Sequence, residues 1–248
     1  MFRSTARLFA PVLLSGLLLA TPAAWAGSFT PEQRAEIVGI LREALRSDPS
    51  ILRDAVQALQ VDEGARQDKA ARAAIAKNHD ALQADPADPV AGNPAGDVTV
   101  VEFYDTRCPY CRRMLPTIAA LLKAEPSVRL VYKDLPMLGP SSQVEAHALL
   151  AAQRQGGYLR LREALMQAIA PSTPESIRAE AERQGLDGAR LLRDMDDPAI
   201  HARLEANADL ARDLDVEGTP ALVIGKKRIL GAMELADLRA AVAQARTH

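Results

Sequence analysis

The only two cysteines of this 248-residue chain, Cys108 and Cys111, lie three positions apart. They follow an apolar run over residues 98–104 that predicts a buried strand, and they open a stretch with helical periodicity. At a helix N-terminus the unpaired backbone N–H groups and the helix dipole favour a thiolate on the first sulfur. The pattern is typical of thiol–disulfide exchange, so we expect Cys108 to be the exposed, attacking sulfur and Cys111 to resolve mixed disulfides.

Other uses of the cysteine pair are weaker hypotheses. A structural disulfide between positions this close would close too short a loop to stabilise a fold of this size. A zinc site needs two more ligands, and the four histidines of the chain do not have zinc-finger spacing. A Cu(I) site formed by both thiolates stays open as an accessory role. Exchange itself needs no cofactor beyond the two cysteines.

The N-terminus predicts export. Arg3 and Arg7 precede an apolar stretch over residues 8–20, and residues 24–26 fit a small-x-small cleavage site. The apolar stretch is shorter than the roughly twenty residues that span a bilayer. We therefore expect a signal peptide over residues 1–26, cleaved after Ala26, and no membrane insertion of the mature chain. Export places the protein in an oxidising compartment, where a disulfide persists.

The segment over residues 27–84 is expected to be helical. Thr30 has the form of an N-cap, and the apolar spacing predicts helices over residues 31–47, 49–60 and 61–82. So few residues bury too little surface to form a core alone. Their apolar stripes need another surface, which is either a second copy of the chain in a homo-oligomer or the main domain.

Residues 85–96 are rich in Pro, Gly and Asp, which predicts an exposed and fairly stiff linker. The main domain is expected to span residues 97–248. The net charge of the chain, −2 at pH 7, is ordinary and argues against a nucleic-acid partner.

The main domain begins with a β-α-β pattern. Helices are expected to dominate over about residues 139–214, where Ser142 and Glu145 have the spacing of a capping box. The other predicted elements are a strand over 98–104, a helix over 109–124, a strand over 128–133, short strands over 221–224 and 228–231, and a helix over 234–245.

Two charged residues lie within the predicted core strands. Glu102 is in the first strand, where a charge is costly unless it is paired or protonated. Lys133 on the next strand is placed to reach it, and such a pair would relay a proton to or from Cys111. In the alternative interpretation Glu102 ends the strand on a solvated face, and the pattern does not decide between the two.

Three stretches resemble the bacterial DsbA-like thiol–disulfide oxidoreductases, namely residues 101–111, 131–140 and 218–225. Within this group the chain is most similar to the ScsC-type proteins linked to copper tolerance, which carry an N-terminal helical segment. The resemblance covers the chain well from about residue 97 onward, and residues 30–82 more loosely. It implies an α/β thioredoxin fold with an inserted helical subdomain, preceded by an N-terminal helical segment.

The resemblance also implies roles for individual residues. In that family a buried acid lies six residues before the first cysteine, which Glu102 matches, whereas Lys133 fits less strictly. A cis proline that binds substrate backbone faces the disulfide, which Thr219 and Pro220 match.

The residues around the cysteines also differ from those of better-known relatives. Arg107 stands where thioredoxins place tryptophan. Pro109 and Tyr110, which we expect to contact substrate, stand where strong oxidases have Pro-His, so the oxidising strength is left open.

These features predict a periplasmic protein disulfide oxidoreductase. Its partners would be client proteins with thiols or disulfides and a membrane redox protein that recycles the pair. The helical segment favours an oligomer with several active sites facing one client, and hence isomerase or reductase activity. The alternatives are a monomeric dithiol oxidase and a copper-binding protein that uses the reduced thiols.

Overall fold

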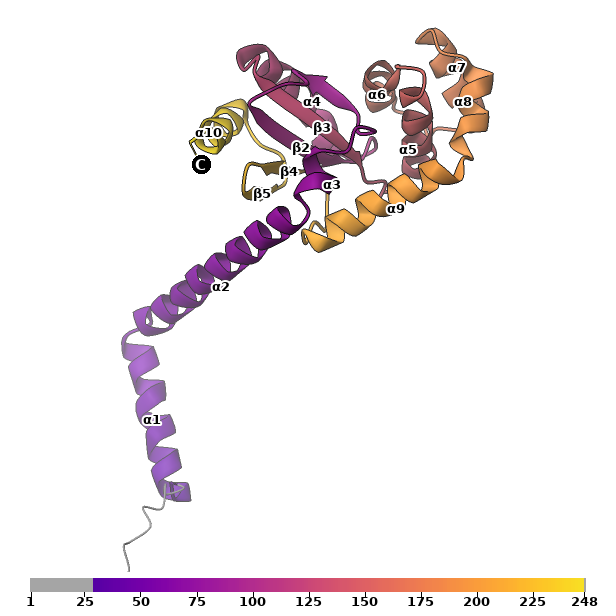
Figure 1. Ribbon diagram of the computed structural model, residues 1–248. Coiled ribbons are helices and arrows are strands. Elements are labelled where there is room, and N and C mark those ends of the chain that lie inside the picture. The colour runs from indigo at the N-terminus through magenta and orange to yellow at the C-terminus, as the bar shows by residue number, and fades with distance from the viewer. Residues whose placement is uncertain (1–28, 248) are drawn as a thin grey trace, which may run out of the picture. The chain divides into compact units, whose positions relative to one another are not determined.

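The computed structural model describes residues 29–247, so the predicted signal peptide lies outside the described residues. The chain divides between Ala58 and Leu59 into two compact units. Figure 1 shows its elements, which are α1 (Pro31–Ser47), α2 (Ser50–Lys77), α3 (His79–Gln83), β1 (Val90–Gly92), β2 (Val98–Tyr104), α4 (Pro109–Ala124), β3 (Val128–Asp134), α5 (Pro140–Gln153), α6 (Tyr158–Gln167), α7 (Pro174–Arg183), α8 (Gly188–Met195), α9 (Pro198–Asp213), β4 (Ala221–Ile224), β5 (Lys227–Leu230) and α10 (Leu235–Ala245).

In the N-terminal unit, α1 begins where the sequence predicts because Thr30 caps it. The Thr30 hydroxyl accepts a hydrogen bond from the Gln33 N–H at 3.2 Å, and the Gln33 side chain accepts one from the Thr30 N–H at 2.9 Å. Within the described residues of this unit none is buried, and the apolar side chains of Ile37, Ile40 and Leu41 are exposed. The unit therefore carries apolar surface that its own described residues do not cover.

The second and third predicted helices are a single helix. The predicted break between residues 60 and 61 is wrong, since α2 is continuous through this point. The sequence has no proline there, and an ion pair between Arg66 and Asp62, one turn apart, supports the helix just beyond it. Its only buried residues, Ala71 and Ile75, lie near its C-terminal end. That end of α2 therefore packs into the core of the second unit.

The second unit contains a five-stranded sheet in the order β1-β3-β2-β4-β5. β2 and β3 are parallel and are joined through α4, which confirms the predicted β-α-β pattern. β4 is antiparallel to β2, and β4 and β5, which match the two predicted short strands, form an antiparallel hairpin. Gly225 turns this hairpin with a φ of 58°, a conformation that favours glycine.

β1 lies within the segment that the sequence predicts as a linker. It pairs antiparallel with β3, with Val90 opposite Val131. Asp88, just before it, is only 4% exposed. The prediction of an exposed linker over residues 85–96 is therefore wrong, because these residues extend the sheet. The compact unit accordingly begins well before residue 97.

Helices cover both faces of this sheet, because side chains alternate along each strand. On β2, Val100 and Tyr104 face one core while Val101 and Phe103 face the other. The first core receives side chains from α4, α10 and the helices α5–α8, and the second from the end of α2, α3 and the C-terminal part of α9. The helices between β3 and β4 form the predicted insertion, beside the sheet in Figure 1.

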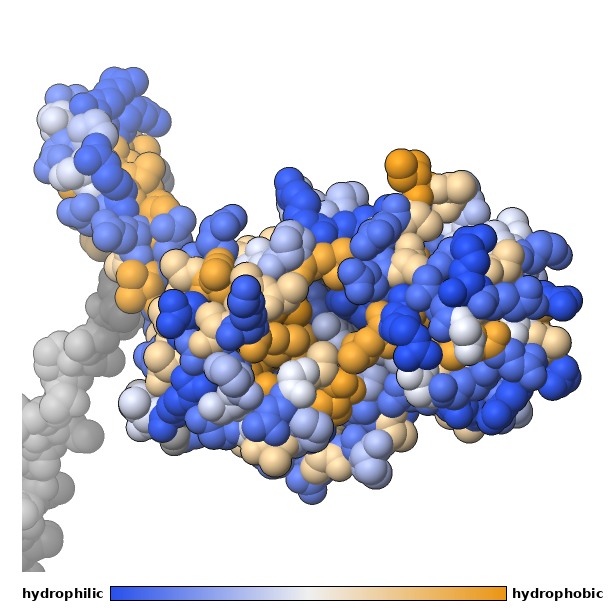
Figure 2. Space-filling model, turned by 90° about the horizontal axis from the view of Figure 1, so that it is seen from above, coloured by the Kyte–Doolittle hydropathy of each residue, from blue (hydrophilic) through white to orange (hydrophobic). Residues whose placement is uncertain are grey.

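The surface is largely hydrophilic, with local apolar patches. On the face drawn in Figure 2, apolar residues lie on both sides of a hollow in the second unit. Four of the exposed large apolar side chains of this unit are Tyr110, Met137, Leu138 and Ile169. Among residues 29–247, no helix combines the length and apolar character that crossing a membrane requires.

Candidate active site

The two cysteines lie at the N-terminal end of α4. Cys108 is the N-cap residue and Cys111 lies in the first turn, and both are free thiols. Cys108 is 4% exposed and Cys111 is fully buried. The prediction of an exposed Cys108 is therefore wrong for this reduced structure, although Cys108 is the less buried of the two.

The loop that ends at Pro220 lies against Cys108. The Cys108 thiol donates to the backbone carbonyl of Thr219, with 3.2 Å between Sγ and oxygen. The Thr219–Pro220 peptide bond is cis, as the resemblance implies. The sheet brings this loop to the cysteines, since Ala221 at the start of β4 lies opposite Phe103 near the end of β2.

Glu102 is fully buried in β2, between Val100 and Tyr104 of the core that contains the cysteines. Arg162 of α6 donates to its Oε2 at 3.3 Å, whereas Oε1 has no partner among the described residues. Burial raises the pKa of Glu102, and the charge of Arg162 partly offsets this rise. The interpretation of Glu102 as a solvated strand end is therefore wrong, and its burial, which the resemblance implies, is confirmed.

Arg162 is a site residue that the sequence did not reveal. Its guanidinium carbon lies 4.3 Å from the ring centre of Tyr104 and 4.1 Å from that of Tyr132. Both contacts are cation–π interactions, which are strongest where water is excluded. Arg162 lies 60 positions from Glu102 in the sequence, so no local spacing could have indicated the pair.

Lys133 does not reach Glu102. The parallel register pairs Lys133 with Phe103 and Glu102 with Tyr132, so the two charged side chains point to opposite faces of the sheet. Lys133 is buried and instead donates to Asp88 at 2.5 Å. The predicted Glu102–Lys133 pair is therefore wrong, and Lys133 joins the segment before β1 to the sheet.

The surroundings of Cys111 disfavour its thiolate. Burial raises the pKa of the Cys111 thiol, and the negative charge of Glu102 raises it further. A buried thiol of this kind stays protonated until something accepts its proton. Glu102 is the buried acid whose charge acts on it, so the two groups are electrostatically coupled.

Asp105 organises the loops around the cysteine pair, a role that the sequence did not indicate. It is buried, and the Cys108 N–H donates to its backbone carbonyl at 3.1 Å. Its carboxylate accepts four hydrogen bonds at 2.7–3.0 Å, from the N–H groups of Arg107, Met137 and Leu138 and from the hydroxyl of Ser142.

The predicted capping box of Ser142 and Glu145 at the start of α5 is wrong. The helix begins at Pro140, two residues before Ser142, and its N-cap Gly139 has no side chain. Ser142 instead binds Asp105, while Glu145 accepts a hydrogen bond from Ser172 at 2.5 Å. Both polar side chains connect the inserted helices to the loops near the cysteines.

Arg107, the residue before Cys108, holds the loop between α6 and α7. Its guanidinium donates to the backbone carbonyls of Ala168, Ile169 and Ala170 at 3.3, 2.9 and 3.0 Å. The side chain of Ile169 is nevertheless 89% exposed. Arg107 therefore fixes the backbone of a loop that presents an apolar side chain to solvent.

Pro109 and Tyr110 open α4 on the accessible side of the motif. Pro109 is the first helical residue, where the missing N–H costs nothing. Tyr110 is 54% exposed, and the Arg113 guanidinium lies 4.4 Å from its ring centre. Tyr110 is thus available to a protein that approaches the cysteines, as expected.

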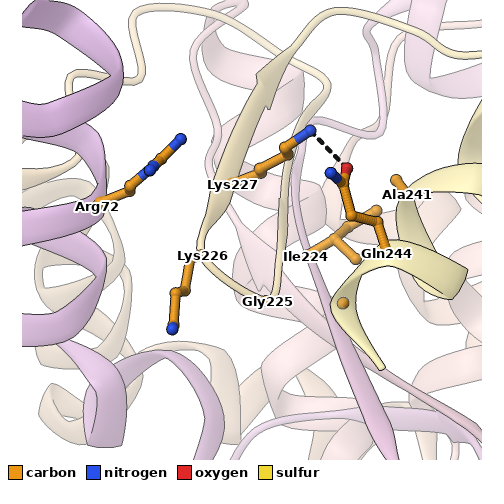
Figure 3. Close-up of a pocket in the computed structure, with 8 residues that line it drawn as sticks. Arg72, Ile224, Gly225, Lys226, Lys227, Ala241 and Gln244 are labelled. Atoms are coloured by element: carbon orange, nitrogen blue, oxygen red, sulfur yellow. Dashed lines mark hydrogen bonds between the residues drawn. The ribbon is translucent and has the colours of Figure 1, made fainter. Parts of the chain in front are cut away.

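A cavity of about 300 Å³ lies elsewhere in the second unit, at the turn between β4 and β5 (Figure 3). The cationic residues Arg72, Lys226 and Lys227 surround it, and Ile224 and Ala241 are among its apolar lining residues. None of the lining residues belongs to the cysteine site, so this cavity has no part in the chemistry of the thiols.

Comparison with known protein families shows to which family this chain belongs. The model of the DSBA-like thioredoxin domain matches residues 99–243, which is more than half of the chain. The chain belongs to this family. A second model, the N-terminal domain of the copper resistance protein ScsC, matches residues 33–66. The protein thus combines a DsbA-like domain of thioredoxin-like fold with an N-terminal segment that matches the ScsC N-terminal domain.

Two solved structures and one curated protein illustrate what this DsbA-like chain is similar to. The structure of a thioredoxin-like oxidoreductase from Silicibacter pomeroyi is 42% identical, with a TM-score of 0.67 over 69% of this chain and 99% of that one. A linker-deletion mutant of Proteus mirabilis ScsC is 28% identical, with a TM-score of 0.67 over 90% of this chain and 99% of that one. The thiol:disulfide interchange protein DsbA of Burkholderia cepacia is 26% identical over 58% of this chain and 77% of that protein.

A similar domain occurs within larger proteins. The chain is 33% identical to the Na⁺/H⁺ antiporter NhaA 3 of Salinispora tropica over 160 residues, which make up 64% of this chain. The chain spans 24% of the length of that antiporter, about a quarter.

Proposed function

We propose that this protein exchanges disulfides with client proteins in the periplasm, with Cys108 as the attacking sulfur and Cys111 as the resolving one. The observation that supports this most is the placement of Cys108, which caps α4 while its thiol donates to Thr219 next to a cis proline. Free N–H groups at the helix end stabilise a thiolate there. An incoming client that reaches Cys108 would therefore meet the backbone of Thr219, which is half-buried beside it.

In the oxidising direction, a client thiolate attacks Cys108 of the Cys108–Cys111 disulfide. The bond between the two sulfurs breaks, Cys111 leaves as a thiolate and takes up a proton, and a mixed disulfide forms. A second client thiolate then attacks the client sulfur, which releases Cys108 and leaves the pair reduced by two electrons. A membrane redox partner would reoxidise or reduce the pair after each cycle.

In the reducing or isomerising direction, the Cys108 thiolate attacks a client disulfide, and Cys111 releases the client if rearrangement stalls. This step requires Cys111 to lose its proton inside the protein. We assign Glu102 as the group that accepts it, since Glu102 is buried, electrostatically coupled to Cys111 and held by Arg162.

The N-terminal unit favours the isomerase or reductase direction. Its exposed apolar residues would be covered in a homo-oligomer, and an oligomer would direct several cysteine pairs at one misfolded client. Sedimentation of the chain with and without residues 27–58, which end before the part of α2 that packs into the core, tests this part. Monomers in both forms would favour the alternative, a monomeric dithiol oxidase.

The match to the copper resistance ScsC N-terminal domain favours a second candidate, Cu(I) binding by the reduced thiols. Two variants separate the two functions. Cys111→Ser should accumulate clients linked to Cys108 by a disulfide if the protein exchanges disulfides, and Cys108→Ser should trap none. A copper carrier would lose Cu(I) affinity in both variants and trap no client in either.

A further inference from the structure

His147 of α5 and His201 of α9 lie next to each other on the inserted helices, with their rings in an edge-to-face arrangement. His147 Nε2 is 3.1 Å from His201 Nδ1, and the two ring centres are 4.5 Å apart. His147 is half-buried and His201 is exposed. Neither residue takes part in the chemistry of the cysteines.

A second contact of His147 determines which of its two ring nitrogens carries the proton. Its Nδ1 lies 2.7 Å from the backbone carbonyl of Gln143, which has no proton and can only accept. In the neutral ring Nδ1 therefore carries the proton, which leaves a lone pair on Nε2, 3.1 Å from His201 Nδ1. A ring N–H donated to a backbone carbonyl is the arrangement that orients metal-binding histidines in proteins.

The separation of the two nitrogens suits one metal ion. With metal–nitrogen bonds of about 2.0–2.1 Å, two ligands lie about 2.9 Å apart at a right angle and about 3.4 Å apart at a tetrahedral angle. The observed 3.1 Å lies between these values. The metal would replace the proton shared between the rings, and His201 would then carry its proton on the outer Nε2.

The two helices hold this geometry without help from a ligand. An ion pair between Arg154 and Asp197, 2.7 Å long, joins the same two helices. Arg154 is seven residues after His147 and Asp197 is four before His201, so the ion pair and the histidines lie along one seam.

We propose that His147 and His201 form a surface site for a divalent transition metal, with Cu²⁺ favoured. Imidazole suits Cu²⁺, Zn²⁺ and Ni²⁺, and Cu²⁺ binds such nitrogen ligands most tightly. Within residues 29–247 there is no group of three or more His, Cys, Asp or Glu that could hold a metal. The site therefore has two protein ligands, and water fills the remaining coordination positions. It is separate from Cu(I) binding by thiols and does not depend on disulfide exchange.

Calorimetric titration of the chain with Cu²⁺ alone tests the site, with the two cysteines closed as a disulfide so that no thiolate binds metal. We expect one equivalent of Cu²⁺ to bind, and electron paramagnetic resonance to show two imidazole nitrogens on the ion. His147→Ala and His201→Ala should each lower the affinity at least about tenfold. His79→Ala, which changes an exposed histidine of α3, is the matched control and should leave the affinity unchanged.

Thermal unfolding gives a second readout that does not rely on the heats measured by calorimetry. A ligand that binds only the folded protein raises the Tm, so Cu²⁺ should raise the Tm of the parent chain and of His79→Ala. It should not raise the Tm of His201→Ala, whose exposed position leaves the metal-free fold intact. Cu²⁺ binding by His147→Ala and His201→Ala that is as tight as binding by the parent chain, or no binding by the parent chain, would overturn the proposal.

Discussion

Arg162, in the inserted helix α6, lies 3.3 Å from Glu102 in the central strand β2 and supplies the counter-charge for this buried acid. Their side chains are 6% and 0% exposed. The helical insertion therefore packs on the sheet and also supplies a positive charge to the core that contains the cysteines. Four predictions follow from this arrangement and from its neighbours.

Loss of the counter-charge should destabilise the fold. Arg162→Met leaves Glu102 buried and unpaired, which we expect to lower the free energy of unfolding by about 3–5 kcal/mol. Urea denaturation measures this loss. Arg160→Met, on the exposed side of the same helix, should change the free energy of unfolding by about 0.5 kcal/mol or less. Adding Glu102→Gln to Arg162→Met should recover most of the loss; an unaltered stability in Arg162→Met would contradict the ion pair.

Glu102→Gln should slow the release of clients from Cys108. Two effects oppose each other, because the substitution removes the charge that raises the pKa of Cys111 and also removes the proton acceptor. General base catalysis is worth about 10²–10⁴-fold, whereas one pKa unit is worth about tenfold, so the loss of the base should dominate. Single-turnover release of a peptide bound to Cys108 should slow by about tenfold or more at neutral pH.

The same measurement on Glu163→Gln provides the control, because Glu163 is exposed on α6. Its release rate should equal that of the parent chain. Release from Glu102→Gln that is as fast as, or faster than, release from the parent would show that Glu102 acts on Cys111 through its charge alone.

Arg107→Ala should free the loop that carries Ile169. Three hydrogen bonds from the guanidinium to backbone carbonyls are lost, and bonds from charged donors each contribute about 1.5–3 kcal/mol. Amide hydrogen exchange over residues 168–172 should accelerate, while exchange in the sheet stays unchanged. Arg113→Ala, which loses only a contact with Tyr110, is the control. Equal exchange rates in the two variants would show that Arg107 does not hold the loop.

The parts of the site that follow from local pattern were predictable from the sequence. The strand before Cys108, the helix that begins after Cys108 and the Thr30 cap of α1 each depend on residues a few positions apart, and the structure confirms all three. The helix boundary near residue 60 failed because no residue there ends a helix.

The remaining features depend on contacts between distant segments. β1 is three residues long and lies among prolines and glycines, so that only its pairing with β3 makes it a strand. The choice of Arg162 over Lys133 as the partner of Glu102 depends on which face of the sheet each side chain points to. Sequence spacing identifies that two charges lie in the core, but register and the packing of α6 decide their partners.

A buried carboxylate at the end of β3 should make stability depend on pH. Asp134 accepts hydrogen bonds at 2.8 Å from the hydroxyl groups of Tyr104 and Tyr158, which lie 2.7 Å from each other. Burial raises the pKa of Asp134 from 3.8 to about 6, although the tyrosine hydroxyls and the charge of Arg162 oppose this rise. Between these two values the folded chain binds more protons than the unfolded chain, so the stability contributed by this group falls as the pH increases.

Asp134→Asn removes this titration and keeps the tyrosines paired, since its amide oxygen accepts from Tyr104 and its amide nitrogen donates to Tyr158. The free energy of unfolding of the variant, relative to that of the parent chain, should therefore rise by about 2 kcal/mol between about pH 4.5 and pH 7.5. Urea denaturation at both pH values measures the difference, and groups that titrate equally in both proteins cancel from it. A difference that stays constant with pH would mean that Asp134 is already ionised in the folded chain at the lower pH, because its hydrogen bonds then outweigh the cost of burial.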